Sequence, residues 1–172
     1  QELHRGPAMI AAMLGADGRG SAVHQTWIDL DQPKGKAVIF HGGEVLPAKM
    51  MRGSKKGSAI PLVTNPDSAV MVMAEGIETT LSALAANAVP GASYWAGGDL
   101  GNMAGIQRKV PGQRWSGLPD LDDGNAFVPP PWVRRLIFVQ DGDSAPAKTR
   151  AQLESGLRRA MAKRPGLVGQ IV

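Results

Sequence analysis

Three acidic residues follow two apolar segments of the sequence, in positions where they could bind a divalent metal ion. Glu75-Gly76 ends the apolar run 69–74, and Asp141 and Asp143 follow the run 136–139. Mg²⁺ prefers hard carboxylate oxygens and keeps positions open for phosphate oxygens. Glu75 could bind a second ion or act as a general acid/base. Alternatively, Asp141 lies in a simple turn and Asp143 or Ser144 caps the following helix; the pairing with Glu75 favours the metal site.

The predicted elements would bring these residues to one edge of a sheet. Continuous apolar runs are typical of strands that are buried in a parallel sheet, and apolar residues at helical spacing separate them. Strand–helix alternation predicts an α/β domain whose ligands bind beyond the carboxyl ends of the strands. The elements expected are strands over 69–74, 93–96, 136–139 and 167–172, and helices over 77–88, 99–106 (N-capped by Asp99) and 145–163.

The first sixty residues have a different pattern. Alternating residues predict a hairpin of strands 7–14 and 22–30 with a turn at Asp17-Gly18, followed by a short strand over 37–40. Segment 49–57 is expected to be an exposed loop, which either only connects strands or contacts phosphates through Lys49, Arg52, Lys55 and Lys56. We therefore expect a β-rich N-terminal subdomain (1–66) and an α/β catalytic domain (67–172) with an irregular insert at 107–131.

Composition excludes several classes of protein. The chain has 172 residues, a formal charge of +4 and no cysteine, which excludes a disulfide scaffold and a cysteine zinc site within it. No apolar run approaches the ~20 residues that a membrane-spanning helix needs, so no membrane partner is expected. The absence of a leader-like start predicts a cytoplasmic location.

Segment 73–83, MAEGIETTLSA, resembles the EGIETALSA motif of the Toprim domain in phage- and plasmid-type DNA primases. Segment 136–144, LIFVQDGDS, resembles the hydrophobic strand and D-x-D motif of the same family, and YWAGGDLGN at 94–102 is similar to its WAALSAGNL segment. The resemblance implies a Rossmann-like Toprim fold. It also implies that Glu75 is the general acid/base and that Asp141 and Asp143 are ligands of Mg²⁺ (or Mn²⁺). Gln25 stands where the family usually has Arg, and the insert is longer than the family's usual connection.

The function that the resemblance implies is Mg²⁺-dependent nucleotidyl transfer in DNA replication, as the catalytic core of a primase that makes RNA primers. Its partners would be a single-stranded DNA template and NTPs, with a helicase or a zinc-binding module outside this chain. A Toprim nuclease and a non-catalytic DNA- or nucleotide-binding module are the alternatives. The expected substrate contacts are Lys49, Arg52, Lys55, Lys56, Gly76 and Asp99, together with a basic helix face of Lys148, Arg150, Arg158, Arg159 and Lys163.

Overall fold

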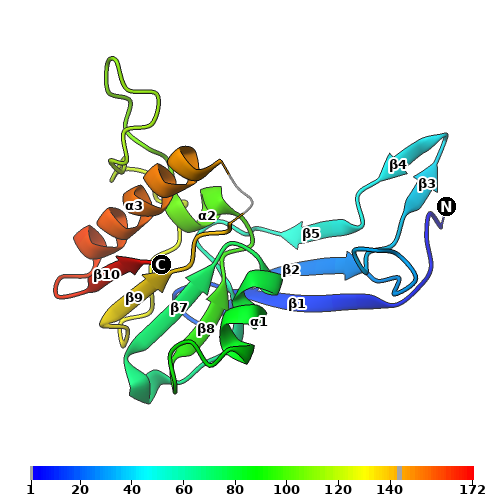
Figure 1. The fold of residues 1–172 in the computed structure, drawn as a ribbon, viewed down its shortest axis with the longest axis horizontal. Helices are drawn as coiled ribbons and strands as arrows, with labels where there is room; N and C mark the ends of the chain where they lie inside the picture. The colour runs from blue at the N-terminus through cyan, green and yellow to red at the C-terminus, as the bar shows by residue number, and fades with distance from the viewer. Residues whose placement is uncertain (1, 143–144) are drawn as a thin grey trace.

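The computed structural model describes residues 2–142 and 145–172. Its N-terminal part is an antiparallel sheet in which β2 lies between β1 and β5. The predicted hairpin is confirmed, since Ala8 lies opposite Trp27 and Met13 opposite Ala22. This N-terminal part, from β1 to β5, projects from the rest of the molecule and is called the arm below (Figure 1). A two-stranded hairpin of β3 and β4 lies at its far end. The bounds are β1 Ala8–Leu14, β2 Gly20–Trp27, β3 Ile39–His41, β4 Glu44–Leu46 and β5 Lys49–Gly53.

A second, five-stranded sheet has the order β10-β9-β7-β8-β6. All neighbouring strands are parallel except β6, which runs antiparallel to β8 at the edge. The chain therefore has a mixed α/β fold with a mostly parallel sheet and a small antiparallel part before it. The bounds are β6 Ile60–Val63, β7 Val70–Ala74, β8 Ser93–Ala96, β9 Arg135–Phe138 and β10 Val168–Ile171, with a 3-10 turn at Pro66–Ser68.

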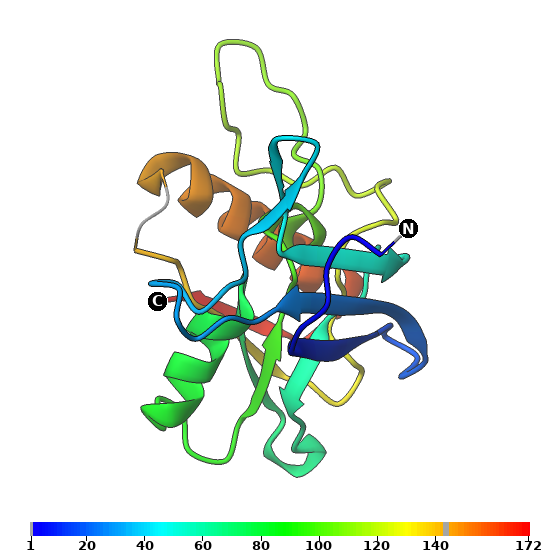
Figure 2. The ribbon, with the colours of Figure 1, turned by 90° about the vertical axis from the view of Figure 1, so that its right-hand side faces the viewer.

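Helices cover both faces of this sheet (Figures 1 and 2). Because successive side chains of a strand point to opposite faces, Met71 and Met73 pack with Leu153 of α3, whereas Val72 packs with Leu84 of α1. The central strands are thus buried on both sides, which explains their uninterrupted apolar runs. None of the helices in the described ranges combines the length and apolar character that crossing a bilayer requires. The bounds are α1 Ile77–Ala85, α2 Leu100–Ala104 and α3 Pro146–Lys163.

Three features differ from the sequence-based prediction, and the first is the strand β4, which was not predicted. Residues 49–53 are not a loop but β5, whose Met50 lies opposite Gln25 of β2, so only 54–57 turn away from the sheet. The strand β6 was not predicted, and it joins the five-stranded sheet although it precedes residue 67. The expected division at residue 66 therefore does not coincide with the boundary between the sheets. Insert 107–131, which is described throughout, contains isolated bridges but no helix or strand.

Candidate active site

The sheet topology brings Glu75 and Asp141 to neighbouring positions. Strands β7 and β9 are parallel neighbours, with Met73 opposite Phe138, and the Val139 N–H donates to the Met73 carbonyl at 2.9 Å. Glu75 and Asp141 follow these strands directly. From β7 the chain crosses first to β8 on one side and later reaches β9 on the other, so the order reverses between β7 and β9. Such a switch point is where open α/β sheets bind ligands.

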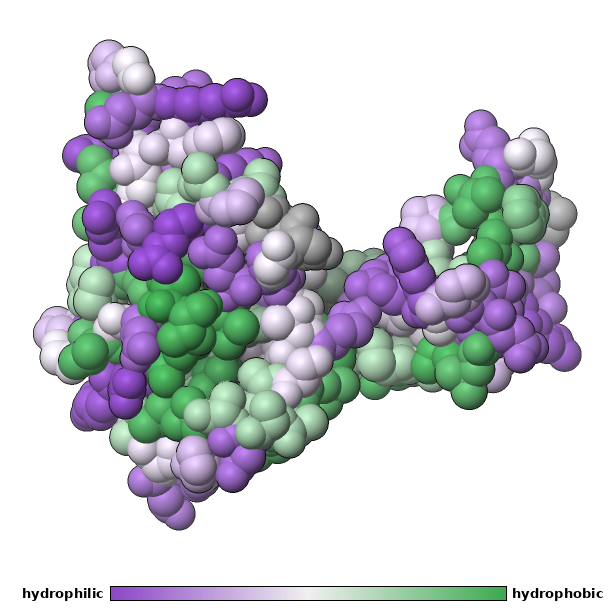
Figure 3. Space-filling view, in the orientation of Figure 1, coloured by the Kyte–Doolittle hydropathy of each residue, from purple (hydrophilic) through white to green (hydrophobic). Residues whose placement is uncertain are grey.

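A cleft of about 640 Å³ opens at this edge, and Glu75 and Asp141 both line it. Gly76, also predicted as a site residue, joins Glu75 to helix α1 and lines the cleft, and Lys49 reaches the same cleft from β5. Figure 3 shows a hollow between the projecting arm and the body of the molecule, on the side toward which β7 points in Figure 1. The structure thus brings together four of the sequence-predicted site residues.

Backbone hydrogen bonds hold the chain that follows β7. The N–H of Gly98, whose φ of 81° favours glycine, donates to the Glu75 carbonyl at 2.9 Å. Gly76 is the N-cap of α1 in an extended conformation, and its carbonyl accepts from the Thr80 hydroxyl at 2.7 Å. Glu75 is therefore placed by a fixed turn between the end of β7 and the start of α1.

Lys36, Lys49 and Glu78 form an ion-pair cluster in the cleft. The Glu78 Oε1 atom lies 3.0 Å from the Lys36 Nζ atom and 3.5 Å from the Lys49 Nζ atom. Partial burial raises the pKa of Glu78, but its backbone N–H and Lys36, with Lys49, outweigh this effect and lower it to about 2. Nothing in the sequence singled out Lys36 or Glu78, because they come together only when the arm folds against α1.

His24 lies on β2 close to this cluster and is buried on the same face of the strand as Ala22 and Thr26. Burial lowers its pKa, Lys49 and Lys36 lower it further, and Glu78 acts in the opposite direction. The neutral imidazole is therefore the favoured form beside two ammonium groups.

Asp99 serves a different pocket. It N-caps α2, since its carboxylate accepts from the Asn102 N–H at 2.7 Å, and it forms an ion pair with Lys55. Burial raises the pKa of Asp99, but Lys55 and the Asn102 N–H outweigh this effect and lower it. Asp99, Lys55 and Lys56 line a neighbouring pocket of about 340 Å³. Arg52 is exposed on β5 and lines neither cavity.

Asn102 is a structural residue that sequence reasoning missed. Its side-chain amide donates to the carbonyls of Ser58 at 2.7 Å and Gly97 at 2.8 Å, and its oxygen accepts from the Gly57 N–H at 2.9 Å. The turn that carries Lys55 and Lys56 is thereby docked on the loop after β8. An asparagine inside a short helix gives no sequence signal for such a role.

The predicted basic face of α3 is wrong in one respect. Arg159 is buried rather than solvated, and it donates to carbonyl oxygens of the insert, including that of Asp123 at 2.6 Å. Arg158 donates to the Gly117 carbonyl at 2.9 Å. Helical periodicity misses this contact because a distant loop covers that face of the helix.

The metal-binding prediction is only partly covered by the structure. Among the described residues, no group of three His, Asp or Glu side chains is placed to hold a metal ion. Asp143, the predicted partner of Asp141, lies outside the described residues. Asp141 and Glu75 supply two carboxylates to one cleft, and this donor type fits Mg²⁺.

The comparisons with known proteins concern mainly the N-terminal part. A family model described as a domain of unknown function, DUF7146, matches residues 1–62. No curated protein and no solved structure matches the chain. The matched segment includes the strand and loop that supply Lys49 and Lys36 to the cleft, and it ends before the strands that precede Glu75 and Asp141.

Proposed function

We propose that the chain catalyses Mg²⁺-dependent nucleotidyl transfer on DNA, as the catalytic core of a phage- or plasmid-type DNA primase that makes RNA primers. The observation that carries the proposal is the cleft in which Glu75 and Asp141 meet Lys36 and Lys49 at the switch point of a mostly parallel sheet. Carboxylates and ammonium groups in one cleft suit a metal-bound triphosphate. The resemblance to Toprim primases supplies the reaction class, and the Rossmann-like Toprim fold is part of the proposal.

In this proposal Asp141 and Asp143 hold Mg²⁺ or Mn²⁺, with Asp143 assigned by resemblance alone. The bound ion would neutralise phosphate charge and promote ionisation of the attacking hydroxyl. Glu75 accepts the proton of the primer's 3′-hydroxyl while the oxygen of that hydroxyl forms a bond to the α-phosphorus of the incoming NTP. The bond from that phosphorus to pyrophosphate breaks in the same displacement.

Lys49 and Lys36 would contact the phosphates of the incoming nucleotide. In the free protein both ammonium groups contact Glu78. A bound phosphate would therefore replace Glu78 as their partner or share them with it. Glu78 then keeps the two cations in the cleft before substrate arrives. The single-stranded template and a helicase or zinc-binding module outside this chain remain proposed partners, in the cytoplasm.

The test is a Mg²⁺ or Mn²⁺ titration with labelled single-stranded DNA and NTPs, in which primer synthesis and DNA cleavage are measured together. Glu75→Gln should lower synthesis by roughly 10²- to 10⁴-fold, the range for loss of a general acid/base. Glu44→Gln is the matched control, because Glu44 is an exposed carboxylate on the β3–β4 hairpin.

The outcomes separate the three functions. Metal-dependent cleavage without synthesis would replace the primase with the nuclease alternative. Neither product with any metal, or equal activity of Glu75→Gln and Glu44→Gln, would refute catalysis at this cleft and leave a binding module.

A further inference from the structure

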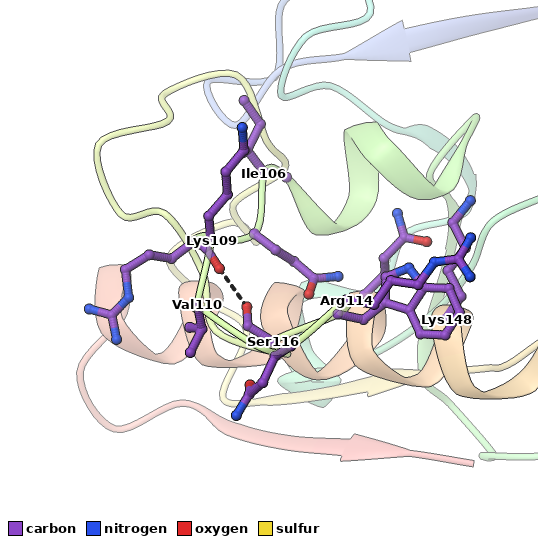
Figure 4. Close-up of a pocket in the computed structure, with 12 residues that line it drawn as sticks. Ile106, Lys109, Val110, Arg114, Ser116 and Lys148 are labelled. Carbon is purple, nitrogen blue, oxygen red and sulfur yellow. Dashed lines mark hydrogen bonds between the residues drawn. The ribbon is translucent and has the colours of Figure 1, made fainter.

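The insert between α2 and β9 carries a third cavity, of about 580 Å³, which we call the insert pocket (Figure 4). Four of its lining residues are cationic and none is acidic. Among the described residues, no ion pair neutralises any of the four. The pocket therefore presents concentrated positive charge from Arg108, Lys109, Arg114 and Lys148.

Three of these cations stand on a loop that is folded on itself, and Lys148 lies on α3. The Arg108 N–H donates to the Leu118 carbonyl at 2.9 Å, and the Ser116 hydroxyl donates to the Arg108 carbonyl at 2.7 Å (dashed in Figure 4). Val110 and Gln113 pair across the tip of the loop. Arg158 of α3 holds the returning side of the loop to the helix by donating to the Gly117 carbonyl. The positive charge is thus held on a defined scaffold that projects from the body in Figure 2.

An aromatic ring completes the pocket. Trp115 is 37% exposed although it lines the cavity, and the Arg114 guanidinium lies 4.9 Å from the centre of its ring. Exposed aromatic rings beside cations are typical of surfaces that bind single-stranded nucleic acid, where bases stack on the rings and cations follow the backbone. Stacking tolerates any base, because every base has a π-face.

We propose that the insert pocket binds a segment of single-stranded DNA, with a base stacked on Trp115 and phosphates on the surrounding cations. A DNA single strand fits better than one nucleotide, because the cations come from both sides of the insert loop and from α3. In Figure 4 the labelled Lys109 and Arg114 lie toward opposite ends of the lining. The inference rests on the proposed function in taking the strand to be the template, which would be held outside the cleft.

The test measures fluorescence anisotropy of a labelled oligodeoxythymidine of about 20 nucleotides, longer than the ~4–16 nucleotides that one OB fold binds. EDTA is present, so that binding is measured without metal-dependent chemistry. Trp115→Ala should weaken binding roughly 5- to 150-fold, the range for loss of one stacked base. Lys109→Ala should reduce the slope of log K against log salt by about 0.7, as expected for one phosphate contact on a single strand.

Arg134→Ala is the matched control, because Arg134 is an exposed cation that does not line the pocket. It should leave the affinity and the salt slope unchanged, and circular dichroism should confirm that all three variants fold. Binding by Trp115→Ala and Lys109→Ala that equals binding by Arg134→Ala would overturn the inference. Competition by thymidine monophosphate as strong as that by the oligonucleotide would also overturn it, since the pocket would then take a nucleotide.

These results are separable from those for the proposed function. Binding that depends on Trp115, in a protein that neither synthesises nor cleaves, would refute the proposed function and leave the pocket as a DNA-binding site. Metal-dependent synthesis with binding that ignores Trp115 would refute the pocket alone.

Discussion

Arg159 offers a sharp test of how the insert is held to the rest of the molecule. The side chain is 1% exposed and donates to the carbonyl oxygens of Asp120 at 2.6 Å, Asp123 at 2.6 Å and Ile106 at 3.2 Å. Its Nη2 atom also lies 3.5 Å from the buried Asp123 carboxylate. The Ile106 N–H is the main group that lowers the pKa of Asp123, and Arg159 lowers it further, so this carboxylate is ionised. Arg159→Met keeps much of the side-chain length but removes the charge and all the donors.

The expected cost follows from what the substitution leaves unpaired. A hydrogen bond to a charged group contributes about 1.5–3 kcal/mol, and removing one partner of a buried ion pair costs about 3–5 kcal/mol. Because these interactions share one side chain, their energies do not add. We therefore expect Arg159→Met to lower the free energy of unfolding by about 3–5 kcal/mol.

Urea denaturation measures this loss as a lower midpoint with an unchanged m-value. Arg158→Met is the matched control on the neighbouring residue, which is half-exposed and makes one hydrogen bond to the insert. It should cost about 1 kcal/mol or less. In Arg159→Met, exchange protection should also fall at the amides of Arg108 and Asp120, whose hydrogen bonds close the base of the insert. Equal losses for the two variants would refute the structural role of Arg159.

Three further predictions concern backbone strain and pH. Gly105→Ala should cost at least ~1 kcal/mol more than Gly112→Ala in urea denaturation. Both φ values are near 75°, but a Cβ atom at 105 would lie 2.7 Å from the Arg159 guanidinium, whereas one at 112 meets nothing within 4 Å. Glu78→Gln should cost less than about 1 kcal/mol at pH 7, because the side chain is more than half exposed. Since folding lowers the pKa of Glu78 from 4.5 to about 2, this cost should be constant above about pH 5 and vanish as the pH falls toward 2 in urea melts at several pH values. Because burial lowers the pKa of His24, its imidazole is protonated at a higher pH in the unfolded chain than in the folded one, and the fold loses stability as the pH falls below 6.5. His24→Gln should lessen this loss in the same series of urea melts.

The central strands of the sheet and the edge that carries the cleft could be predicted because their signals are local. The apolar run ending at Ala74 needs no partner to be recognised, and Glu75-Gly76 marks its end. Asp99 could be predicted as an N-cap because capping joins residues three apart, and its carboxylate does accept from the Asn102 N–H. That Glu75 and Asp141 share a cleft follows from parallel pairing, once both strands are known to be neighbours.

The features that could not be predicted depend on contacts between distant segments. β5 has two cations and a glycine, a composition typical of a loop, and becomes a strand because it pairs with β2. Glu78 occupies an ordinary solvent position of α1 until the arm brings Lys36 and Lys49 to it. Arginine is a residue type usually found at the surface, and Arg159 is buried only because the insert folds back over it.

The placement of the cations separates two tasks that the net charge of +4 combines. The carboxylates Glu75 and Asp141 stand on the turns that end two central strands, where the hydrogen-bonded sheet fixes their backbone. The cations of the cleft come from the arm, and those of the insert pocket come from the insert and α3. Under the proposed function, residues at the ends of the sheet strands carry out the reaction, and segments attached to the sheet provide most of the nucleic-acid binding. The exposed cations of the insert lie apart from the sheet, so template binding could change with their sequence while the reaction stays the same.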